Sequence, residues 1–230
     1  MTIAENVALV RENMDRAALA AGRDPKEILL LAATKMNDAD RVRQAIAAGV
    51  DLCGENRVQE MLEKQAQGAY AGVPLHFIGH LQKNKVKQVV GLAELIHGTD
   101  SLELLSLISR VAQARGLTQD VLLEVNIGGE SAKSGFAPEE VPEALARAAA
   151  LPALRVRGLM AIPPVCAAPE ENRPFFLRMQ QLFIDNSEKK YDNIRMDFLS
   201  MGMSGDYTEA IACGANLVRV GSGIFGPRQY

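Results

Sequence analysis

Lys35 is the residue of this sequence that is best placed for covalent chemistry. It directly follows residues 28–34 (ILLLAAT), which carry no charge, whereas the other lysines lie among polar neighbours. An amine at the edge of an apolar segment loses part of its hydration, which lowers its pKa and frees the neutral amine to attack an aldehyde. The spacing indicates a lysine that could form a Schiff base; a solvent-facing lysine that merely follows a strand is the other interpretation.

Two segments near the C-terminus have the composition of phosphate-binding turns. LSMGMSGDYTEA places Ser200 and Ser204 between an apolar run and a helical pattern, and RVGSGIFG adds Gly221 and Ser222 in a second small-residue turn. Free backbone N–H groups at the start of a helix suit an anion. The second turn also contains G-x-G-x-x-G, but the dinucleotide fingerprint requires an acidic residue about 20 residues later. Only four residues follow Gly226, so we do not expect a dinucleotide.

Arg219 precedes Gly221 by two residues, so on a strand both project from the same face. An inward arginine needs a partner, which could be a carboxylate such as Glu55 or the ring nitrogen of a heteroaromatic cofactor. A strand-end lysine, two anion-suited turns and this arginine together favour pyridoxal 5'-phosphate (PLP).

The elements that must position these residues follow a regular alternation. After an N-terminal helical segment that ends before Gly22, short apolar runs alternate with helical patterns without a change in composition. This rhythm predicts an α/β fold: a single-domain (β/α)8 TIM barrel over residues 1–230 with an additional N-terminal helix, a doubly wound open sheet being the competitor. The expected strands cover residues 28–34, 50–55, 74–79, 93–99, 120–127, 154–162, 197–202 and 216–226.

In such a barrel the carboxyl ends of the strands meet at one mouth, where chemistry is found, and the turns after strands seven and eight commonly hold a phosphate. Polar side chains follow several of the apolar runs at this end. The strand-end residues are Lys35, Glu55, Asn56, His80, Asn126, Met160, the turn from Ser200 to Ser204, Arg219, Gly221 and Ser222.

Composition narrows the partners and the location. The net charge of −3, with basic residues scattered among acidic ones, does not suit nucleic acid. No apolar stretch approaches the roughly 20 residues of a membrane span, and the N-terminus lacks the pattern of a signal peptide. Three widely separated cysteines fit a reducing compartment. We therefore expect a cytoplasmic protein with a small-molecule partner. A closed barrel has no free strand edge, which permits the monomer we expect.

From residue 28 onwards the sequence resembles the pyridoxal phosphate homeostasis protein family, which is similar in fold to the barrel domain of bacterial alanine racemase. The blocks that carry the resemblance occur in the same order as in the family: ATK, GENRVQE, HFIGHLQKNK, LLEVNIGGESAKSGF, VRGLMAIPP, LSMGMSGDYTEAI and VRVGSGIFGPR.

The resemblance implies a role for each matched residue. Lys35 would form a Schiff base with PLP, Asn56 would lie beside the cofactor ring, and Arg219 would face the pyridine nitrogen. The phosphate would be held by Ser200, Ser204, Gly221 and Ser222. At position 222 the family often has threonine, and serine keeps the hydroxyl.

The resemblance also implies a non-catalytic role in intracellular vitamin B6 homeostasis, in which PLP is buffered or passed to PLP-dependent apo-enzymes. An arginine at the pyridine nitrogen discourages its protonation and weakens the ring as an electron sink. Racemisation would also need a second acid/base, which the racemase family takes from a further C-terminal domain; we expect no such domain here. The alternative is a PLP-dependent racemase or related enzyme that uses Tyr207 or His80 as its second base.

Other interpretations have less support. His76 and His80 could serve a metal-dependent hydrolase, but a core role is more usual for so few histidines, so we expect no metal. Glu55 with Asp206 could form a carboxylate pair, for which capping or ion pairing is the simpler account. A secondary site at Lys83, Lys85, Lys87 or Lys133 is left open, because a lysine cluster is more often a charged helix face.

Overall fold

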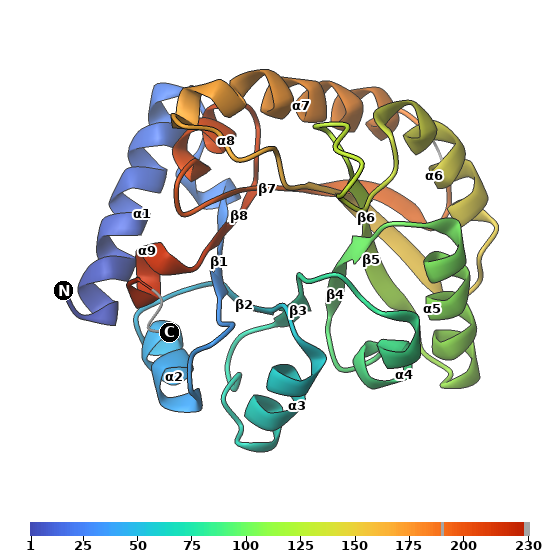
Figure 1. Ribbon diagram of the computed structural model, residues 1–230, viewed down its shortest axis with the longest axis horizontal. Helices are drawn as coiled ribbons and strands as arrows, with labels where there is room; N and C mark the ends of the chain where they lie inside the picture. Colours follow the sequence, from blue (N-terminus) through green and yellow to red (C-terminus); the bar gives the residue numbers. More distant parts are fainter. Residues whose placement is uncertain (190, 228–230) are drawn as a thin grey trace.

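The computed structural model describes residues 1–189 and 191–227. Among them, eight parallel strands pair in sequence order, and β8 pairs with β1 to close the barrel. Figure 1 shows the strands inside a ring of helices. The (β/α)8 prediction is confirmed, and the open sheet is excluded. The strands are β1 (Leu29–Ala33), β2 (Leu52–Glu55), β3 (Leu75–Phe77), β4 (Leu95–Thr99), β5 (Gln119–Val125), β6 (Leu154–Ala161), β7 (Ile194–Met203) and β8 (Leu217–Val220).

A helix follows each strand, and the seven helices that lie between strands agree with the predicted alternation. In the helix after β4, Ser101 caps the N-terminus by accepting a hydrogen bond from the amide of Leu104. The helices are α1 (Ile3–Ala20), α2 (Ala39–Ala47), α3 (Val58–Ala66), α4 (Val86–Val89), α5 (Leu102–Ala114), α6 (Val141–Ala149), α7 (Arg173–Ser187), α8 (Tyr207–Ala212) and α9 (Ser222–Phe225). The last of these corrects the sequence prediction, in which residues 222–225 belonged to a glycine-rich turn.

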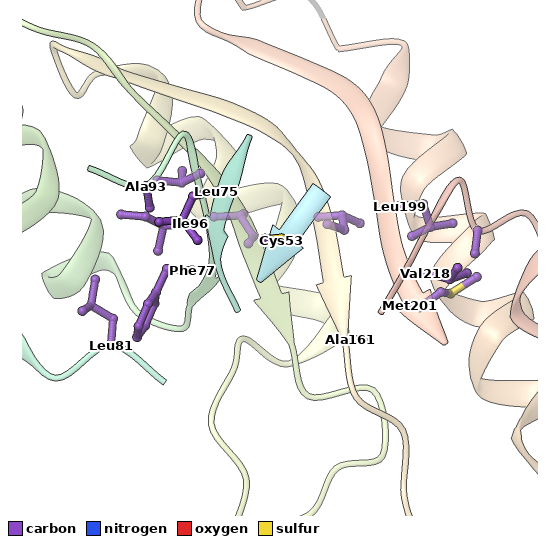
Figure 2. Packing of buried hydrophobic residues seen from close by; sticks show 14 of the residues in the cluster. Cys53, Leu75, Phe77, Leu81, Ala93, Ile96, Ala161, Leu199, Met201 and Val218 are labelled. Atoms are coloured by element: carbon purple, nitrogen blue, oxygen red, sulfur yellow. The ribbon is translucent and has the colours of Figure 1, made fainter. Parts of the chain in front are cut away.

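Both faces of the sheet are buried, which explains why the strands read as continuous apolar runs. On β1, Leu31 and Ala33 belong to a small cluster inside the barrel, whereas Leu30 and Ala32 belong to the large cluster between the strands and the helices. Figure 2 shows part of that outer cluster, with Phe77 and Ile96 packed between neighbouring elements. This two-residue period decides which side chains reach the barrel interior.

Helix α1 packs against α8 and α9 and so supports the loops that follow β7 and β8. Its N-terminus is fixed by a capping box between Thr2 and Glu5. Asn6 donates a hydrogen bond to the carbonyl of Ile224 at 2.8 Å, which ties the first helix to the last. No helix within the described ranges is both long and apolar enough to span a membrane.

Two of the predicted strand-end residues lie within their strands rather than in the turns that follow. Strand β7 continues to Met203, so Ser200 lies within the strand rather than in the turn that follows it. Met160 lies within β6 and is buried inside the barrel with Leu95 and Leu122. Strand β6 ends one residue before the end of the expected segment 154–162, and β7 ends one residue after the end of the expected segment 197–202.

Candidate functional site

The alternation of the strands brings the predicted residues to the barrel mouth. Lys35 continues the inward face of Leu31 and Ala33, and Arg219 continues the inward face of Leu217. Lys35 is half-buried, whereas Arg219 is 4% exposed. Glu55, by contrast, projects outward between the barrel and α3, because its neighbour Gly54 occupies the inward position of β2.

A buried polar cluster fixes the backbone immediately before Lys35. The hydroxyl of Thr34 donates to Glu55 Oε1 at 2.6 Å, and Lys64 Nζ donates to the carbonyl of Thr34 at 2.8 Å. Lys64 Nζ also lies 2.5 Å from Glu55 Oε1, and Tyr70 donates to the same oxygen at 3.1 Å. Glu55 is completely buried. The cluster thus anchors the end of β1 to α3.

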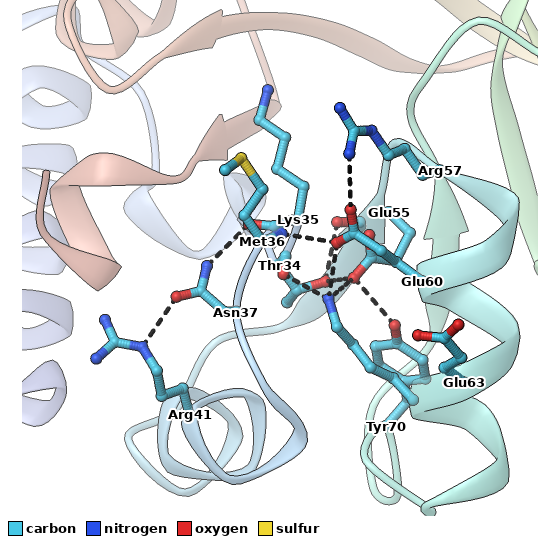
Figure 3. Close-up of polar contacts among 12 residues, drawn as sticks. Thr34, Lys35, Met36, Asn37, Arg41, Glu55, Arg57, Glu60, Glu63 and Tyr70 are labelled. Carbon is cyan, nitrogen blue, oxygen red and sulfur yellow. Dashed lines mark hydrogen bonds and ion pairs between the residues drawn. The ribbon is translucent and has the colours of Figure 1, made fainter. Parts of the chain in front are cut away.

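The backbone immediately after Lys35 is held by the same helix. Met36 has a φ of 61°, a left-handed conformation that is uncommon for a residue other than glycine. Its amide donates to Glu60 Oε2 on α3 at 2.7 Å, which stabilises this conformation. Figure 3 shows the side chain of Lys35 extending away from the Glu55 cluster. Both neighbours of Lys35 are therefore fixed in place. The amine of Lys35 is directed away from the carboxylates of Glu55 and Glu60.

A second set of contacts links the Lys35 loop to α9. Asn37 Nδ2 donates to the carbonyl of Lys35 at 3.0 Å, and Arg41 Nε donates to Asn37 Oδ1 at 2.9 Å. The guanidinium of Arg41 also donates to the carbonyl of Phe225. These contacts hold the lysine loop and the final helix in a fixed relation.

Ser204 joins the turns that follow β7 and β8. Its hydroxyl oxygen accepts hydrogen bonds from the amides of Gly221 at 3.1 Å and Gly223 at 3.2 Å. A Cβ on Gly223 would lie 2.8 Å from the side chain of Val220, so the close approach requires glycine. Ser222 lies between these glycines and is exposed. The two turns predicted to hold an anion are thus adjacent.

Arg219 is held by neutral groups rather than by a carboxylate. Its guanidinium donates to Ser200 Oγ at 2.6 Å and to the carbonyl of Ala161 at 2.9 Å. Burial lowers the pKa of Arg219 to about 10, an effect that the negative charges of Glu124 and Asp206 oppose. The side chain is therefore cationic at neutral pH, and the considered pairing with Glu55 does not occur.

The remaining predicted residues of the mouth face a cavity of ≈ 200 Å³. Asn56 lines this cavity, and its Oδ1 is buried without a hydrogen-bond partner among the described residues. Glu124 on β5 lines it as well, and burial together with the charge of Asp100 raises its pKa. A larger cavity of ≈ 800 Å³ lies at the other end of the barrel, beside Pro74 and Thr118, where strands begin.

The structure separates the residues of the other interpretations. His76 is buried inside the barrel, whereas the side chain of His80 is 59% exposed and lies 3.1 Å from Asp100. No group of three or more potential metal ligands occurs in the described part of the chain. Asp206 accepts hydrogen bonds from the amide of Met203 and from the side chain of Asn172. It shares no hydrogen-bond partner with Glu55 among the described residues, so the considered carboxylate pair is not formed.

Sequence reasoning missed the residues that hold Lys35 in place. Lys64 and Glu60 are four residues apart on one helix, a spacing that indicates only an ordinary surface pair. Their partners Thr34 and Met36 come from a different strand and loop. The left-handed conformation of Met36 has no sequence signal at all.

Comparison with known proteins places the chain among relatives. The family model for the alanine racemase N-terminal domain matches residues 5–229. A pyridoxal phosphate homeostasis protein from Pseudomonas aeruginosa is 42% identical over 229 residues, covering 100% of this chain and 97% of that protein. A pyridoxal phosphate homeostasis protein from Aquifex aeolicus is 40% identical over 230 residues, covering 100% of this chain and 100% of that protein. The chain belongs to the pyridoxal phosphate homeostasis protein family.

Solved structures with bound PLP or with the racemase fold are similar to this chain. PipY of Synechococcus elongatus, solved with PLP bound, is 31% identical with a TM-score of 0.83, over 98% of this chain and 100% of that one. An alanine racemase from Clostridium difficile is 15% identical with a TM-score of 0.71 and shows the shared fold alone; the match covers 98% of this chain and 57% of the racemase.

Replacing Lys64 with methionine should strongly destabilise the protein. Lys64→Met leaves the carboxylate of Glu55 buried without its cation, so we expect the free energy of unfolding to fall by about 3–5 kcal/mol in urea denaturation. Lys83→Met is the matched control, because Lys83 pairs with Glu103 at the exposed surface and its loss should change stability by less than about 1 kcal/mol. Equal losses for the two variants would contradict this account of the cluster.

Proposed function

We propose that this protein binds PLP at the barrel mouth, holds it as a reversible Schiff base on Lys35, and serves in vitamin B6 homeostasis without catalytic turnover. The observation that carries the proposal is the joint placement of a half-buried lysine, a buried cationic arginine and two adjacent turns rich in small residues. The bound PLP of the 31% identical PipY supports it.

The residues present fit this cofactor. PLP supplies an aldehyde that reacts reversibly with a primary amine. Asn56 offers a buried oxygen that lacks a partner in the described chain, as expected for a group that awaits a ligand. Arg219 uses two hydrogen bonds within the protein, and a guanidinium has five N–H donors, so donors remain for the ring nitrogen.

Each side chain then has a defined task. Lys35 supplies the amine, Asn56 lies beside the ring, and Arg219 faces the pyridine nitrogen. Ser204, Gly221 and Ser222 hold the phosphate, because they line the two adjacent turns. We change the proposed role of Ser200, whose fully buried hydroxyl already contacts Arg219. It orients the arginine and does not bind the phosphate.

The charge of the site favours a carrier over an enzyme. Arg219 is cationic at neutral pH, so it donates to the ring nitrogen and disfavours the protonated ring that stabilises carbanions. Neither proposed second base is prepared for this role: Tyr207 is 8% exposed, and His80 lies at the exposed rim beside Asp100. These observations support buffering or transfer of PLP.

The domain organisation, oligomeric state, cellular location and partners of the protein are also part of the proposal. We infer that residues 1–230 form a single PLP-binding domain, that the protein acts as a monomer in the cytoplasm, and that PLP-dependent apo-enzymes receive the cofactor. The free thiols of Cys53 and Cys213 are consistent with a reducing compartment.

Borohydride reduction should attach PLP to Lys35. The purified protein mixed with PLP should show a visible imine band, and peptide mapping after reduction should find the label on Lys35. Lys35→Ala should lose both signals, while Lys26→Ala, a change at an exposed lysine, should keep them. A label confined to another lysine in the wild-type protein would reject the assignment.

Ser204→Ala should weaken binding of PLP but not of pyridoxal, which lacks the phosphate. Loss of the hydroxyl frees the amides of Gly221 and Gly223 and disorders the phosphate turn. We expect Kd for PLP to rise about tenfold, equivalent to ~1.4 kcal/mol, with little change for pyridoxal in fluorescence titrations. Ser187→Ala, at an exposed position of α7, is the control. Parallel weakening of both ligands would place the phosphate elsewhere.

Exchange of the α-proton of amino acids in D₂O should stay at the level of free PLP. A cationic arginine at the ring nitrogen weakens the ring as an electron sink, so loss of the α-proton gains little stabilisation. Mass spectrometry of alanine incubated with the loaded protein measures the exchange, with Lys35→Ala for comparison. Robust exchange that depends on Lys35 would establish the enzyme alternative instead.

A further inference from the structure

Four polar side chains form a continuous chain through the barrel interior. His76 Nδ1 lies 3.0 Å from His97 Nε2, and His97 Nδ1 lies 3.1 Å from Ser200 Oγ. Arg219 donates to Ser200 Oγ at 2.6 Å. The four residues come from β3, β4, β7 and β8, and none is more than 4% exposed. The chain therefore leads from the interior to the arginine of the proposed site.

The arginine sets the direction of every hydrogen bond in this chain. A guanidinium only donates, so Ser200 Oγ accepts from Arg219. If the serine hydroxyl donates to His97 Nδ1, then His97 carries its proton on Nε2 and donates to His76 Nδ1. The opposite order would make both His97 and Arg219 donors to Ser200, whose own proton would then lack an acceptor in the described chain. A buried hydroxyl without an acceptor is unfavourable, so the first order prevails.

The two imidazoles of this chain remain neutral over the physiological range. Burial lowers the pKa of His76 to about 4, which the negative charge of Asp120 opposes. Burial and the neighbouring charges of His76 and Arg219 hold the pKa of His97 well below its usual value. Because both values are depressed, the imidazoles stay uncharged until the solution becomes distinctly acidic.

We propose that His76, His97 and Ser200 are positioning residues that orient the guanidinium of Arg219 through a hydrogen-bond chain of fixed direction, with both imidazoles protonated on Nε2. A hydroxyl that donates to His97 becomes a better acceptor for Arg219, because hydrogen bonds in series polarise one another. The consequence for the pyridine nitrogen rests on the proposed function, but the direction of the chain does not.

The tautomers can be measured without any cofactor. Nitrogen-15 NMR of the histidine side chains in the unloaded protein at pH 7 distinguishes protonated from unprotonated ring nitrogens. The chain has three histidines, so His76→Gln and His80→Gln suffice to assign the signals. We expect the Nε2–H form at His76 and His97, unchanged between pH 8 and 6. An Nδ1–H form at His97, or a charged ring, would overturn the inference.

Variants then test the effect on Arg219. Ser200→Ala and His97→Leu should alter the wavelength and the pH profile of the imine band and weaken PLP binding several-fold, while borohydride still labels Lys35. His97→Gln, which keeps a donor and an acceptor, should largely restore the band. Ser109→Ala removes another buried hydroxyl, which donates to the carbonyl of Pro152, and should leave the band unchanged.

The outcomes separate this inference from the proposed function. If no PLP binds to the wild-type protein, the proposed function fails while the tautomers still decide the direction of the chain. If PLP binds but Ser200→Ala gives the same band, pH profile and affinity as Ser109→Ala, the positioning role is wrong.

Discussion

Closure of eight parallel strands is the constraint on which the rest of this structure depends. A strand presents alternate side chains to opposite faces, so closure sends every second residue into one narrow interior and brings the carboxyl ends together at one mouth. Lys35 and Arg219 are 184 positions apart in the chain, yet they come from neighbouring strands, because β1 and β8 pair directly with Leu31 opposite Arg219. The site follows from closure rather than from any local motif.

Closure also explains why ionised groups are buried on both sides of the sheet. Glu55 lies on the outer face, where Lys64, Thr34 and Tyr70 satisfy one of its oxygens. Arg219 lies on the inner face and donates to two uncharged acceptors, Ser200 Oγ and the carbonyl of Ala161. An isolated buried charge would be strongly unfavourable, so each one fixes the groups around it. The two networks thereby give the mouth a defined shape from opposite sides.

Much of the fold could be predicted from the sequence, because apolar period and helix signals are local. The eight strands, the helix that precedes them and the inward direction of Arg219 could all be predicted from such local signals. Contacts between elements have no such signal. The sequence could not indicate that the hydroxyl of Ser200 accepts from Arg219, or that Glu55 pairs with Lys64 of α3. The short helix α9 escaped prediction because Gly221 and Gly223 are typical of turns.

The hydrogen bond between Asn6 and Ile224 joins α1 to α9 beside the mouth. Arg41 adds a link from the first β–α unit to the same final helix. During synthesis on the ribosome the N-terminal elements emerge first, and they lack these partners until α9 has left the exit tunnel. A nascent chain therefore cannot complete the pocket before α9 is available, and loading with a ligand must follow the synthesis and emergence of this helix.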